Sequence, residues 1–376
     1  MLRALHVAAG NLYGGVEALL LTLARERGQR ASLVPSFCVF FEGRLSEELR
    51  RTGVKVQLIH SVRWSRPWTL LKARAEFEAM LQRDPPDVAI CHSPWAESIV
   101  GAVLRKARIP LVYLQHGTHH RLGIVDVLAR FAPPDLILVN SRYSAQSTSN
   151  LFPGIQMEVW NPPLPSGIQS VAGASRDDVR AALTTPKDIP VIVQVSRMEV
   201  WKGHARNLEA LARLSALSWE LWFVGGAQRP EEERYEAELK ALAQRLGIQA
   251  RVRFLGQRQD VPSLLAAADL FCQPNVEPEP YGLVFLEALA AGLPVIASKF
   301  GGSSEIVDST CGILVDKDIA SLKTALQTLL TDGALRRNLG AAGPARALAL
   351  GSPERQLAKL ELLLRSVASF SQPELG

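Results

Sequence analysis

Cysteine is scarce in this chain. Four occur among 376 residues, and no two of them form a Cys-x-x-Cys pair. Each stands in or beside an apolar, strand-like run, where a free thiol behaves as a small hydrophobic group. We therefore expect reduced, buried core residues at Cys38, Cys91, Cys272 and Cys311.

Long apolar runs are absent as well. No run reaches the roughly 18 residues that a membrane-crossing helix requires, and Met1 leads directly into a strand-like segment. With 47% hydrophobic and 21% charged residues, the composition is that of an ordinary globular protein. We expect a cytoplasmic protein that is long enough for two domains. Its net charge of +5 and pI near 9.1 permit anionic partners without requiring them.

The two commonest phosphate-binding loops are also missing. An apolar run at 3–9 is followed by Gly10-Asn-Leu-Tyr-Gly14-Gly15 and by a helical pattern over 16–27. This predicts a strand, a turn and a helix, but it matches neither G-x-G-x-x-G nor the Gly-Lys-Ser/Thr of a P-loop. The sequence therefore argues against a dehydrogenase and against a P-loop enzyme. The glycines still permit close approach of the backbone to a ligand, with a purely structural turn as the alternative.

Strand-like and helical segments alternate along both halves of the chain. In the first half, strands are predicted at 33–40, 54–59, 87–92, 110–115 and 135–139, and helices at 43–52, 69–83 and 95–107. In the second half, strands are predicted at 190–195, 220–225, 251–255 and 269–273, and helices at 175–184, 207–217, 231–246 and 261–268. This alternation predicts an α/β protein with doubly wound parallel sheets, which bind ligands where the strand order reverses.

A proline-rich stretch separates the two halves. Residues 140–170 contain four prolines and end without a clear periodic pattern, which indicates a domain connection. We predict one domain over 1–165, a second over 166–352, and a last helix with a short tail over 353–376. That helix has five leucines to bury, at positions 357, 360, 362, 363 and 364.

The most informative stretch is 274–304. It opens as a loop, because three prolines lack backbone N–H groups, and it becomes helical at about Gly282, above a strand-like run at 295–297. The amino end of such a helix presents unpaired N–H groups and a partial positive charge, which suits a phosphate. Glu279 precedes the helix and Glu287 lies inside it. Carboxylates beside a phosphate site suit sugar or ribose hydroxyls, whereas capping and surface roles are the alternative.

Glu279-Pro-Tyr-Gly-Leu-Val-Phe-Leu-Glu287, followed by Ala-Leu-Ala-Ala-Gly-Leu-Pro-Val-Ile-Ala, resembles the E-x7-E signature of retaining glycosyltransferases of family 4, also called glycosyl transferases group 1. The similarity covers most of the second half and is weaker in the first. It implies a GT-B fold, in which two Rossmann-like domains face a central cleft, 1–165 binding the acceptor and 166–352 the nucleotide sugar. It also implies that the last helix crosses back to the first domain.

The resemblance implies roles for the second-half residues. Glu287 would accept hydrogen bonds from ribose hydroxyls, and Glu279 from the hydroxyls of the donor sugar. Arg197 and Lys202, which follow a predicted strand, would hold the diphosphate of the donor and stabilise its departure. Backbone N–H groups at Tyr281, Gly282 and Leu283 would assist them. Surface charge in a loop is the alternative for either cation alone.

In the first half, Gly14 and Gly15 would lie opposite the donor diphosphate. His92 and His116 each follow a predicted strand, and both are compatible with a structural role. The resemblance favours His116, which would lie near the anomeric centre, while His119 and His120 blur the assignment. We therefore predict catalytic roles for His116, Glu279, Arg197 and Lys202. A metal site formed by His116, His119 and His120 would lack a carboxylate to complete a known ligand spacing.

Asp316-Lys317-Asp318 has the letters of a D-x-D metal motif, but it stands between an apolar run and a helical pattern. We predict a turn and a helix cap there. Because Arg197, Lys202 and helix N–H groups already meet the diphosphate charge, we expect no metal and no cofactor, with a UDP- or GDP-linked sugar as substrate.

The segment from Arg44 to Arg74 contains eight Lys or Arg against two acidic residues, with Trp64 and Trp68 among them. Basic residues mixed with tryptophan suit an anionic membrane surface. A soluble acceptor or a solvated face would explain them as well. Nucleic acid is excluded as a partner because no binding motif accompanies the charge.

We predict a retaining glycosyltransferase that moves a sugar to a glycan or a lipid-linked acceptor in cell-envelope or exopolysaccharide synthesis. Its predicted location is cytoplasmic, with a peripheral position on the inner face of the membrane as the alternative to a fully dissolved protein. Two other classes stay open. A sugar-nucleotide epimerase of the same fold would lack this E-x7-E arrangement. A non-catalytic nucleotide-sugar-binding protein could lose the first-half groups, yet Gly14, Gly15 and His116 are present.

Overall fold

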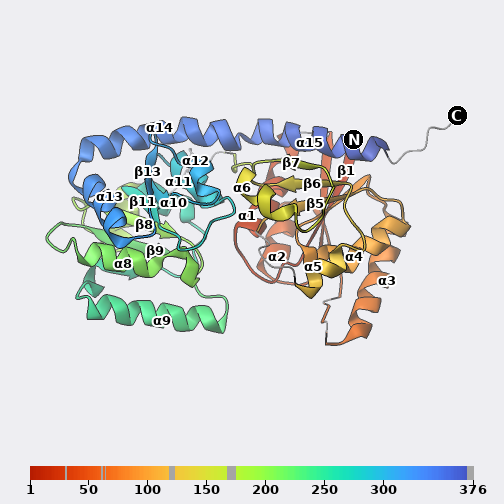
Figure 1. Cartoon of the computed structure of the whole chain (residues 1–376), viewed down its shortest axis with the longest axis horizontal. Helices are drawn as coiled ribbons and strands as arrows, with labels where there is room; N and C mark the ends of the chain where they lie inside the picture. Colours follow the sequence, from red (N-terminus) through yellow and green to blue (C-terminus); the bar gives the residue numbers. More distant parts are fainter. Residues whose placement is uncertain (30–31, 61, 64, 118–122, 167–174, 371–376) are drawn as a thin grey trace. The chain divides into compact units, whose positions relative to one another are not determined.

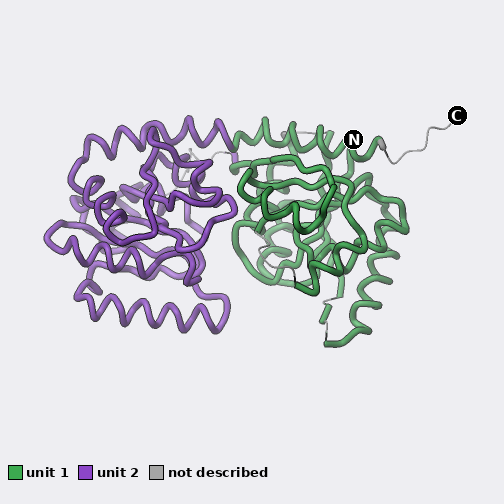
Figure 2. The backbone as a smooth tube through the Cα atoms, viewed as in Figure 1, with its two compact units in different colours: residues 1–165, 351–376 green, residues 166–350 purple. Residues whose placement is uncertain are grey.

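The chain divides into two compact units (Figure 2). Unit 1 comprises residues 1–165 and 351–376, and unit 2 comprises residues 166–350. The computed structural model describes residues 1–29, 32–60, 62–63, 65–117, 123–166 and 175–370. Trp64, His119, His120 and the predicted tail at 371–376 lie outside the described residues.

Unit 1 contains a seven-stranded sheet whose neighbouring strands are all parallel (Figure 1). The strand order is β3-β2-β1-β4-β5-β6-β7, so the order reverses between β1 and β4. The carboxyl ends of these two strands form a topological switch point, where ligands of open α/β sheets bind. The strands are β1 Leu2–Ala8, β2 Leu33–Val39, β3 Lys55–Leu58, β4 Val88–Cys91, β5 Leu111–Gln115, β6 Leu136–Val139 and β7 Met157–Val159.

Helices cover both faces of this sheet. Because side chains alternate along a strand, Leu5 and Val7 join a core with α3, α4 and α5, whereas Leu2 and Ala4 join one with α1 and α15. A third cluster includes α2. The helices are α1 Gly15–Arg25, α2 Arg44–Arg51, α3 Pro67–Arg83, α4 Pro94–Lys106, α5 Ile124–Ala129, α6 Arg142–Thr148 and α15 Pro353–Phe370, with the 3-10 turn η1 Glu26–Gln29.

The last helix, α15, packs on the sheet of unit 1. Leu357, Leu360 and Leu364 are buried against β1, β4, β5 and β6, and the indole Nε1 of Trp160 donates to the carbonyl of Gln356 at 2.9 Å. Burial of all five leucines was predicted wrongly, since Leu362 is 69% exposed. It lies off the stripe that spacings of three and four residues produce on one helix face.

Unit 2 repeats the arrangement with six parallel strands in the order β10-β9-β8-β11-β12-β13. One face packs against α8, α9 and α13, and α11 packs on the other through Phe285 and Phe271. The strands are β8 Val191–Val195, β9 Glu220–Val224, β10 Val252–Phe254, β11 Leu270–Gln273, β12 Val295–Ser298 and β13 Gly312–Val315. The helical elements are α7 Arg176–Ala182, η2 Val200–Lys202, α8 His204–Ala212, α9 Pro230–Arg245, η3 Gln249–Arg251, α10 Val261–Ala267, α11 Leu283–Ala290, α12 Ser303–Ile306, α13 Ile319–Thr331 and α14 Gly333–Gly351.

Two regions differ from the predictions. The stretch 140–170, predicted as a connection, contains α6 and the edge strand β7, whose three residues are too few to show a period. The long helix α14 was not predicted, because it contains several glycines and Pro344. A side chain at Gly340 or Gly343 would clash with the backbone of residues 292 or 289. These glycines therefore let α14 approach the end of α11.

All four cysteines are buried free thiols, as predicted. Burial raises the pKa values of Cys38, Cys91 and Cys272. Among the described residues, no helix combines the length and the apolarity that a membrane crossing needs.

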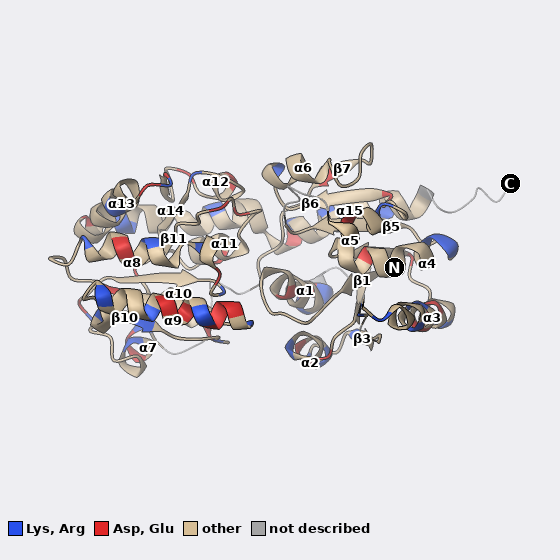
Figure 3. Ribbon diagram, turned by 60° about the horizontal axis from the view of Figure 1, so that its bottom comes forward, with Lys and Arg blue, Asp and Glu red and all other residues tan. Residues whose placement is uncertain are grey.

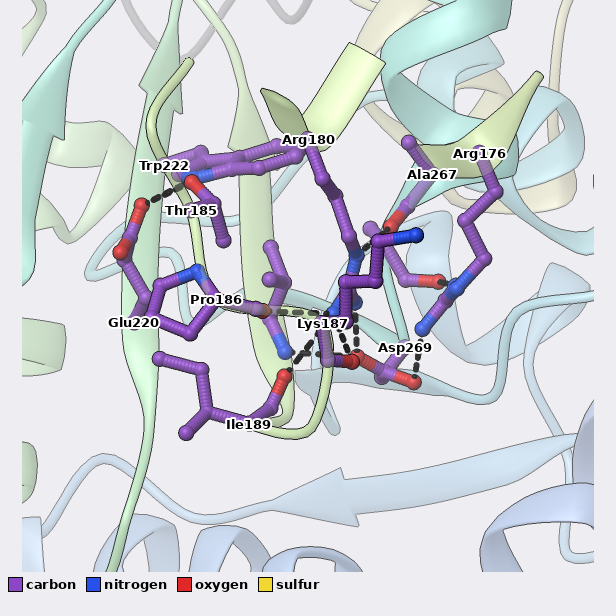
Figure 4. Close-up of polar contacts among 12 residues, drawn as sticks. Arg176, Arg180, Thr185, Pro186, Lys187, Ile189, Glu220, Trp222, Ala267 and Asp269 are labelled. Carbon is purple, nitrogen blue, oxygen red and sulfur yellow. Dashed lines mark hydrogen bonds and ion pairs between the residues drawn. The ribbon is translucent and has the colours of Figure 1, made fainter. Parts of the chain in front are cut away.

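Buried charges fasten the amino edge of the second sheet (Figure 4). Arg180, 1% exposed, donates to the Asp269 carboxylate at 2.5 Å and to the carbonyls of Ala267, Lys187 and Ile189 at 2.9 to 3.1 Å. Asp269 also accepts from the backbone N–H of Val191 at 2.7 Å. The guanidinium thus ties the segment before β8 to the start of β11.

We predict that Arg180→Leu lowers the free energy of unfolding by about 3 kcal/mol, because it leaves a carboxylate and several carbonyls without their buried donor. Urea denaturation of both proteins measures the change. Lys187→Met is the control, since the ion pair between Lys187 and Asp177 is solvent-exposed, and it should leave the midpoint unchanged. Equal midpoints for wild type and Arg180→Leu would contradict the assignment.

Candidate functional site

The carboxyl ends of β8 and β11 bring together the charged residues that the sequence singled out in the second half. These strands are hydrogen-bonded neighbours although β9 and β10 separate them in the sequence, so they form the switch point of unit 2. Arg197 and Lys202 follow β8, and Glu279 follows β11. Strand order therefore explains why residues 77 positions apart meet.

Lys202 and Glu279 form an ion pair. The Nζ atom lies 2.7 Å from Oε2, and the two side chains are 14% and 9% exposed. The same carboxylate oxygen accepts from the amide of Asn275 at 2.8 Å, and the ammonium group lies 3.7 Å from the ring centroid of Trp201. With so little water around it, this pair creates a stronger local field than a surface pair would.

Buried amides and a guanidinium hold the loops that carry this pair. Gln194 donates to the carbonyl of Lys202 at 2.9 Å, and Asn207 donates to the side-chain oxygen of Gln194 at 2.8 Å. Arg206 donates to the carbonyls of Pro274 and Asn275 at 2.9 and 3.1 Å. These supporting residues were missed from the sequence. A glutamine inside the apolar strand Val-Ile-Val-Gln194-Val was the signal that could have found one of them.

Glycine lets the backbone of Glu279 lie against a second turn. Gly301 has a φ of +82°, and a Cβ there would lie 2.6 Å from the carbonyl oxygen of Glu279. Gly302 donates its N–H to that same oxygen at 2.7 Å. Only glycine fits such an approach, so the position of Glu279 is fixed by its backbone as well as by its carboxylate.

The helix α11 begins beside Glu279, close to where it was predicted. Gly282 precedes it with a φ of +90°, and Leu283 is its first residue. The first N–H groups of a helix have no partner inside it, so this end can donate to an anion. Tyr281, in front of it, is buried.

Arg197 does not contact Lys202 in this structure. Its guanidinium lies 3.0 Å from Glu232 and also pairs with Glu199. The two residues predicted to hold the diphosphate therefore follow the same strand, and each pairs with different acidic side chains.

Glu287 lies one turn inside α11. Among the described residues, its carboxylate has no hydrogen-bond or ion-pair partner. Burial raises its pKa to about 7, because the charged form loses its hydration. A carboxylate placed this way can accept hydrogen bonds from a ligand.

The predicted residues of unit 1 also follow strands. Gly14 and Gly15 start α1, and the N–H of Gly14 donates to Glu17 at 2.9 Å. His116 follows β5, and its Nε2 lies 2.9 Å from Nδ1 of His92. The two histidines that the sequence offered as alternatives are therefore in contact.

Asp318 caps α13, as predicted. Its Oδ1 accepts from the N–H of Ser321 at 2.7 Å, and Asp316 pairs with Lys299. Within the described ranges, no group of three or more His, Cys, Asp or Glu residues is arranged to hold a metal ion.

Fewer basic side chains of the segment 44–74 lack an acidic partner than its composition indicated. Figure 3 shows acidic residues beside the basic ones on α3. Arg74 donates to two carbonyls of α4, and ion pairs join Arg44 to Glu48, Arg50 to Glu42, Arg51 to Glu47 and Lys55 to Asp84. Across the described part of the chain, four of the eight basic residues have no acidic partner, namely Arg74 and the three residues Arg63, Arg66 and Lys72.

We predict that Glu287→Gln changes how stability depends on pH. The folded-state pKa of about 7 exceeds the ordinary value of 4.5, so the stability that protonated Glu287 contributes is present below about pH 4.5 and is lost as pH rises through 7. The Tm of the variant minus that of wild type should grow from pH 5 to pH 8, because glutamine cannot ionise. Glu238→Gln, at an exposed position of α9, is the control. A constant difference across this range would contradict the burial effect.

Comparisons with known proteins agree with this geometry. The family model Glycosyl transferases group 1 matches residues 175–346, and Glycosyltransferase Family 4 matches residues 13–164. The lipopolysaccharide core biosynthesis glycosyltransferase LpsE of Rhizobium meliloti is 30% identical over 70% of this chain and 71% of its own length. The D-inositol 3-phosphate glycosyltransferase of Xylanimonas cellulosilytica is 28% identical over 96% of this chain and 81% of its own.

The crystal structure of Anabaena HepE in complex with UDP and glucose superposes with a TM-score of 0.84 at 24% identity, covering 96% of this chain and 100% of the other. That likeness supports the GT-B fold, with its two Rossmann-like sheets. The chain belongs to glycosyltransferase family 4, the glycosyl transferases group 1.

Proposed function

We propose that this chain transfers a hexose from a UDP- or GDP-linked sugar to a saccharide acceptor of the cell envelope, with retention of the anomeric configuration. The observation that carries the proposal is the buried pair of Lys202 and Glu279 beside the amino end of α11. The HepE structure, which contains UDP and glucose, favours a uridine nucleotide among the candidate donors.

The charges fit the demands of this reaction. Breaking the anomeric bond leaves negative charge on the diphosphate, so fixed positive groups that meet this charge lower the barrier. Lys202, Arg197 and the N–H groups at Tyr281, Gly282 and Leu283 would supply them. The ammonium of Lys202 would exchange its contact with Glu279 for one with the diphosphate. No metal ion is needed in this scheme.

The carboxylates would then hold hydroxyl groups. Glu279, once Lys202 engages the phosphate, can accept from the donor sugar, while Asn275 keeps it in place at 2.8 Å. Glu287, with its raised pKa and no protein partner among the described residues, can accept from the ribose. Neither carboxylate is assigned as a covalent nucleophile, so attack from the face of the departing phosphate accounts for retention.

The donor is identified by thermal shift with UDP, GDP and ADP and with their glucose or mannose conjugates. A ligand at about 100 times its Kd adds roughly 2.7 kcal/mol of stability, which is readily measured. A compound is identified as the donor when it raises the Tm and when the enzyme slowly hydrolyses it and releases the nucleotide. If none of these compounds stabilises the protein, the proposed donor class is wrong.

We predict that Lys202→Met lowers the turnover of this nucleotide release by about 100-fold, since the charge it meets is largest in the transition state. The rate is measured at saturating donor, with and without EDTA, and equal rates under both conditions support the metal-free scheme. Lys240→Met is the matched control, because Lys240 is an exposed lysine of α9 in the same unit. Turnover of Lys202→Met within about threefold of wild type would refute the role.

For the acceptor, we propose a saccharide linked to an anionic lipid surface. The start of α3 exposes Trp68 (64%) and Leu71 (67%), near Arg63, Arg66 and Lys72 in the sequence. Exposed aromatic and aliphatic side chains can enter the headgroup region while the cations meet lipid phosphates. On the other side of α4, which packs against both α3 and α5, Ile124 and Val127 of α5 and Phe131 after it are also exposed. The relative that acts in lipopolysaccharide core biosynthesis fits this acceptor class.

We predict that the wild type co-sediments with anionic vesicles at low salt and is released at high salt, because each basic residue contributes about 1 kcal/mol and is screened by ions. Arg63→Glu, Arg66→Glu and Lys72→Glu together should abolish binding. The control reverses the same amount of charge on α9 of unit 2, at exposed Arg234, Lys240 and Arg245. Wild type remaining in the supernatant at low salt would favour a soluble acceptor.

A further inference from the structure

Three imidazole rings form a continuous row in unit 1. His6 lies within β1, His92 follows β4 and His116 follows β5, and these strands are neighbours in the sheet. Nδ1 of His6 lies 2.9 Å from Nε2 of His92, and Nδ1 of His92 lies 2.9 Å from Nε2 of His116. The strand register explains the row, because β1 pairs His6 with Ile90 and β4 pairs Ile90 with Val112. Each histidine is thus two residues further along than the partner of the one before, on the same face of the sheet.

All three rings are uncharged near neutral pH. Burial lowers the pKa of His6 to about 3 and that of His116 to about 4. Burial, together with the neighbouring His116 and His6, also lowers the pKa of His92 well below its usual range. A neutral imidazole has one N–H and one lone pair, on different nitrogens. Every ring in the row can therefore donate in one direction only.

This restriction couples the three tautomers. If His6 donates from Nδ1, then His92 must accept at Nε2 and donate from Nδ1, and His116 must accept at Nε2 and carry its proton on Nδ1. In the reverse state, all three rings carry the proton on Nε2, and Nδ1 of His116 is a lone pair. Any other combination leaves two N–H groups or two lone pairs facing each other, which is costly in a buried site.

The His6 end of the row borders a cavity. His6 lines it together with Glu26, Arg27 and the α15 residues Leu357 and Leu360. Because Nδ1 of His6 faces Nε2 of His92, Nε2 of His6 is the ring nitrogen at the outer end of the row. Glu26 is a carboxylate, which can only accept, so a contact between it and His6, directly or through a water molecule, would place an N–H on Nε2.

We propose that His6, His92 and His116 form one tautomeric unit, in which Glu26 holds the proton on Nε2 of every ring and leaves Nδ1 of His116 as an acceptor. The ligand of that lone pair, a sugar hydroxyl, rests on the proposed function, whereas the tautomeric state is a property of the free protein. His6 and His92 are positioning residues, because they act through His116.

The tautomers are read by long-range proton–nitrogen correlation spectra of the 15N-histidine-labelled, ligand-free protein. The expected spectrum shows a protonated Nε2 and an unprotonated Nδ1 in all three rings. Opposite tautomers in any two of them, or a protonated Nδ1 on His116, would overturn the proposal. The wild-type spectrum decides this without any variant, and single histidine substitutions supply the assignments.

The coupling is tested at the far end of the row. An amide in Glu26→Gln can donate as well as accept, so it should shift all three rings together toward protonated Nδ1. The matched control is Glu76→Gln, whose carboxylate lies 3.0 Å from Nδ1 of His60, and it should change His60 alone. A Glu26→Gln spectrum in which His116 stays unchanged while His6 shifts would exclude the coupled unit.

Activity supplies a second measurement. Residues that fix the tautomer of a functional imidazole are typically worth about 10–100-fold, so His6→Phe should lower the kcat of nucleotide release by about tenfold with the donor KM within about twofold. Unchanged kcat in a folded His6→Phe protein would remove the functional role of the row. If wild type releases no nucleotide, the proposed function fails while the spectra still decide the tautomers.

Discussion

The contact between Lys202 and Glu279 is the interaction on which the site depends. It joins the loop after β8 to the loop after β11, and each loop is held independently, one by Gln194 and the other by Arg206. A buried ion pair by itself is weak support for stability, because desolvation offsets much of the attraction. Its position at a switch point, with glycine backbone packed against Glu279, is better explained by the charge that a ligand would bring.

The two edges of the second sheet use buried charge differently. At the amino edge, Arg180 and Asp269 satisfy one another and the surrounding backbone, which is typical of a structural fastening. At the carboxyl edge, the side-chain oxygens of Gln273 and Asn275 are buried without a hydrogen-bond partner among the described residues. Unsatisfied acceptors are costly, so their concentration beside Glu279 marks the edge that a ligand with hydroxyl groups would complete.

The sequence predicted elements whose signals are local. The strand at 190–195 and the helix beginning near Gly282 were placed within one residue, because apolar runs and glycine stops act over a few positions. Glu232, one of the two acidic partners of Arg197, could not be predicted, since it lies 35 residues away on another element. The helix α14 was missed because its glycines serve packing against α11, which overrides their low helix propensity.

Polar residues inside apolar strands indicate buried hydrogen bonds, which the hydrophobic period of a strand does not predict. His6 in β1 and Gln194 in β8 are buried polar residues in mostly hydrophobic strands, and burying either without a partner would cost free energy. His6 meets His92 through the strand order, and Gln194 meets Asn207 on α8, the helix that follows β8. The same parallel pairing that places ligand groups at the carboxyl edge also connects them to these interior residues. Substitutions in the strand interior should therefore act on the site through hydrogen bonds rather than through packing alone.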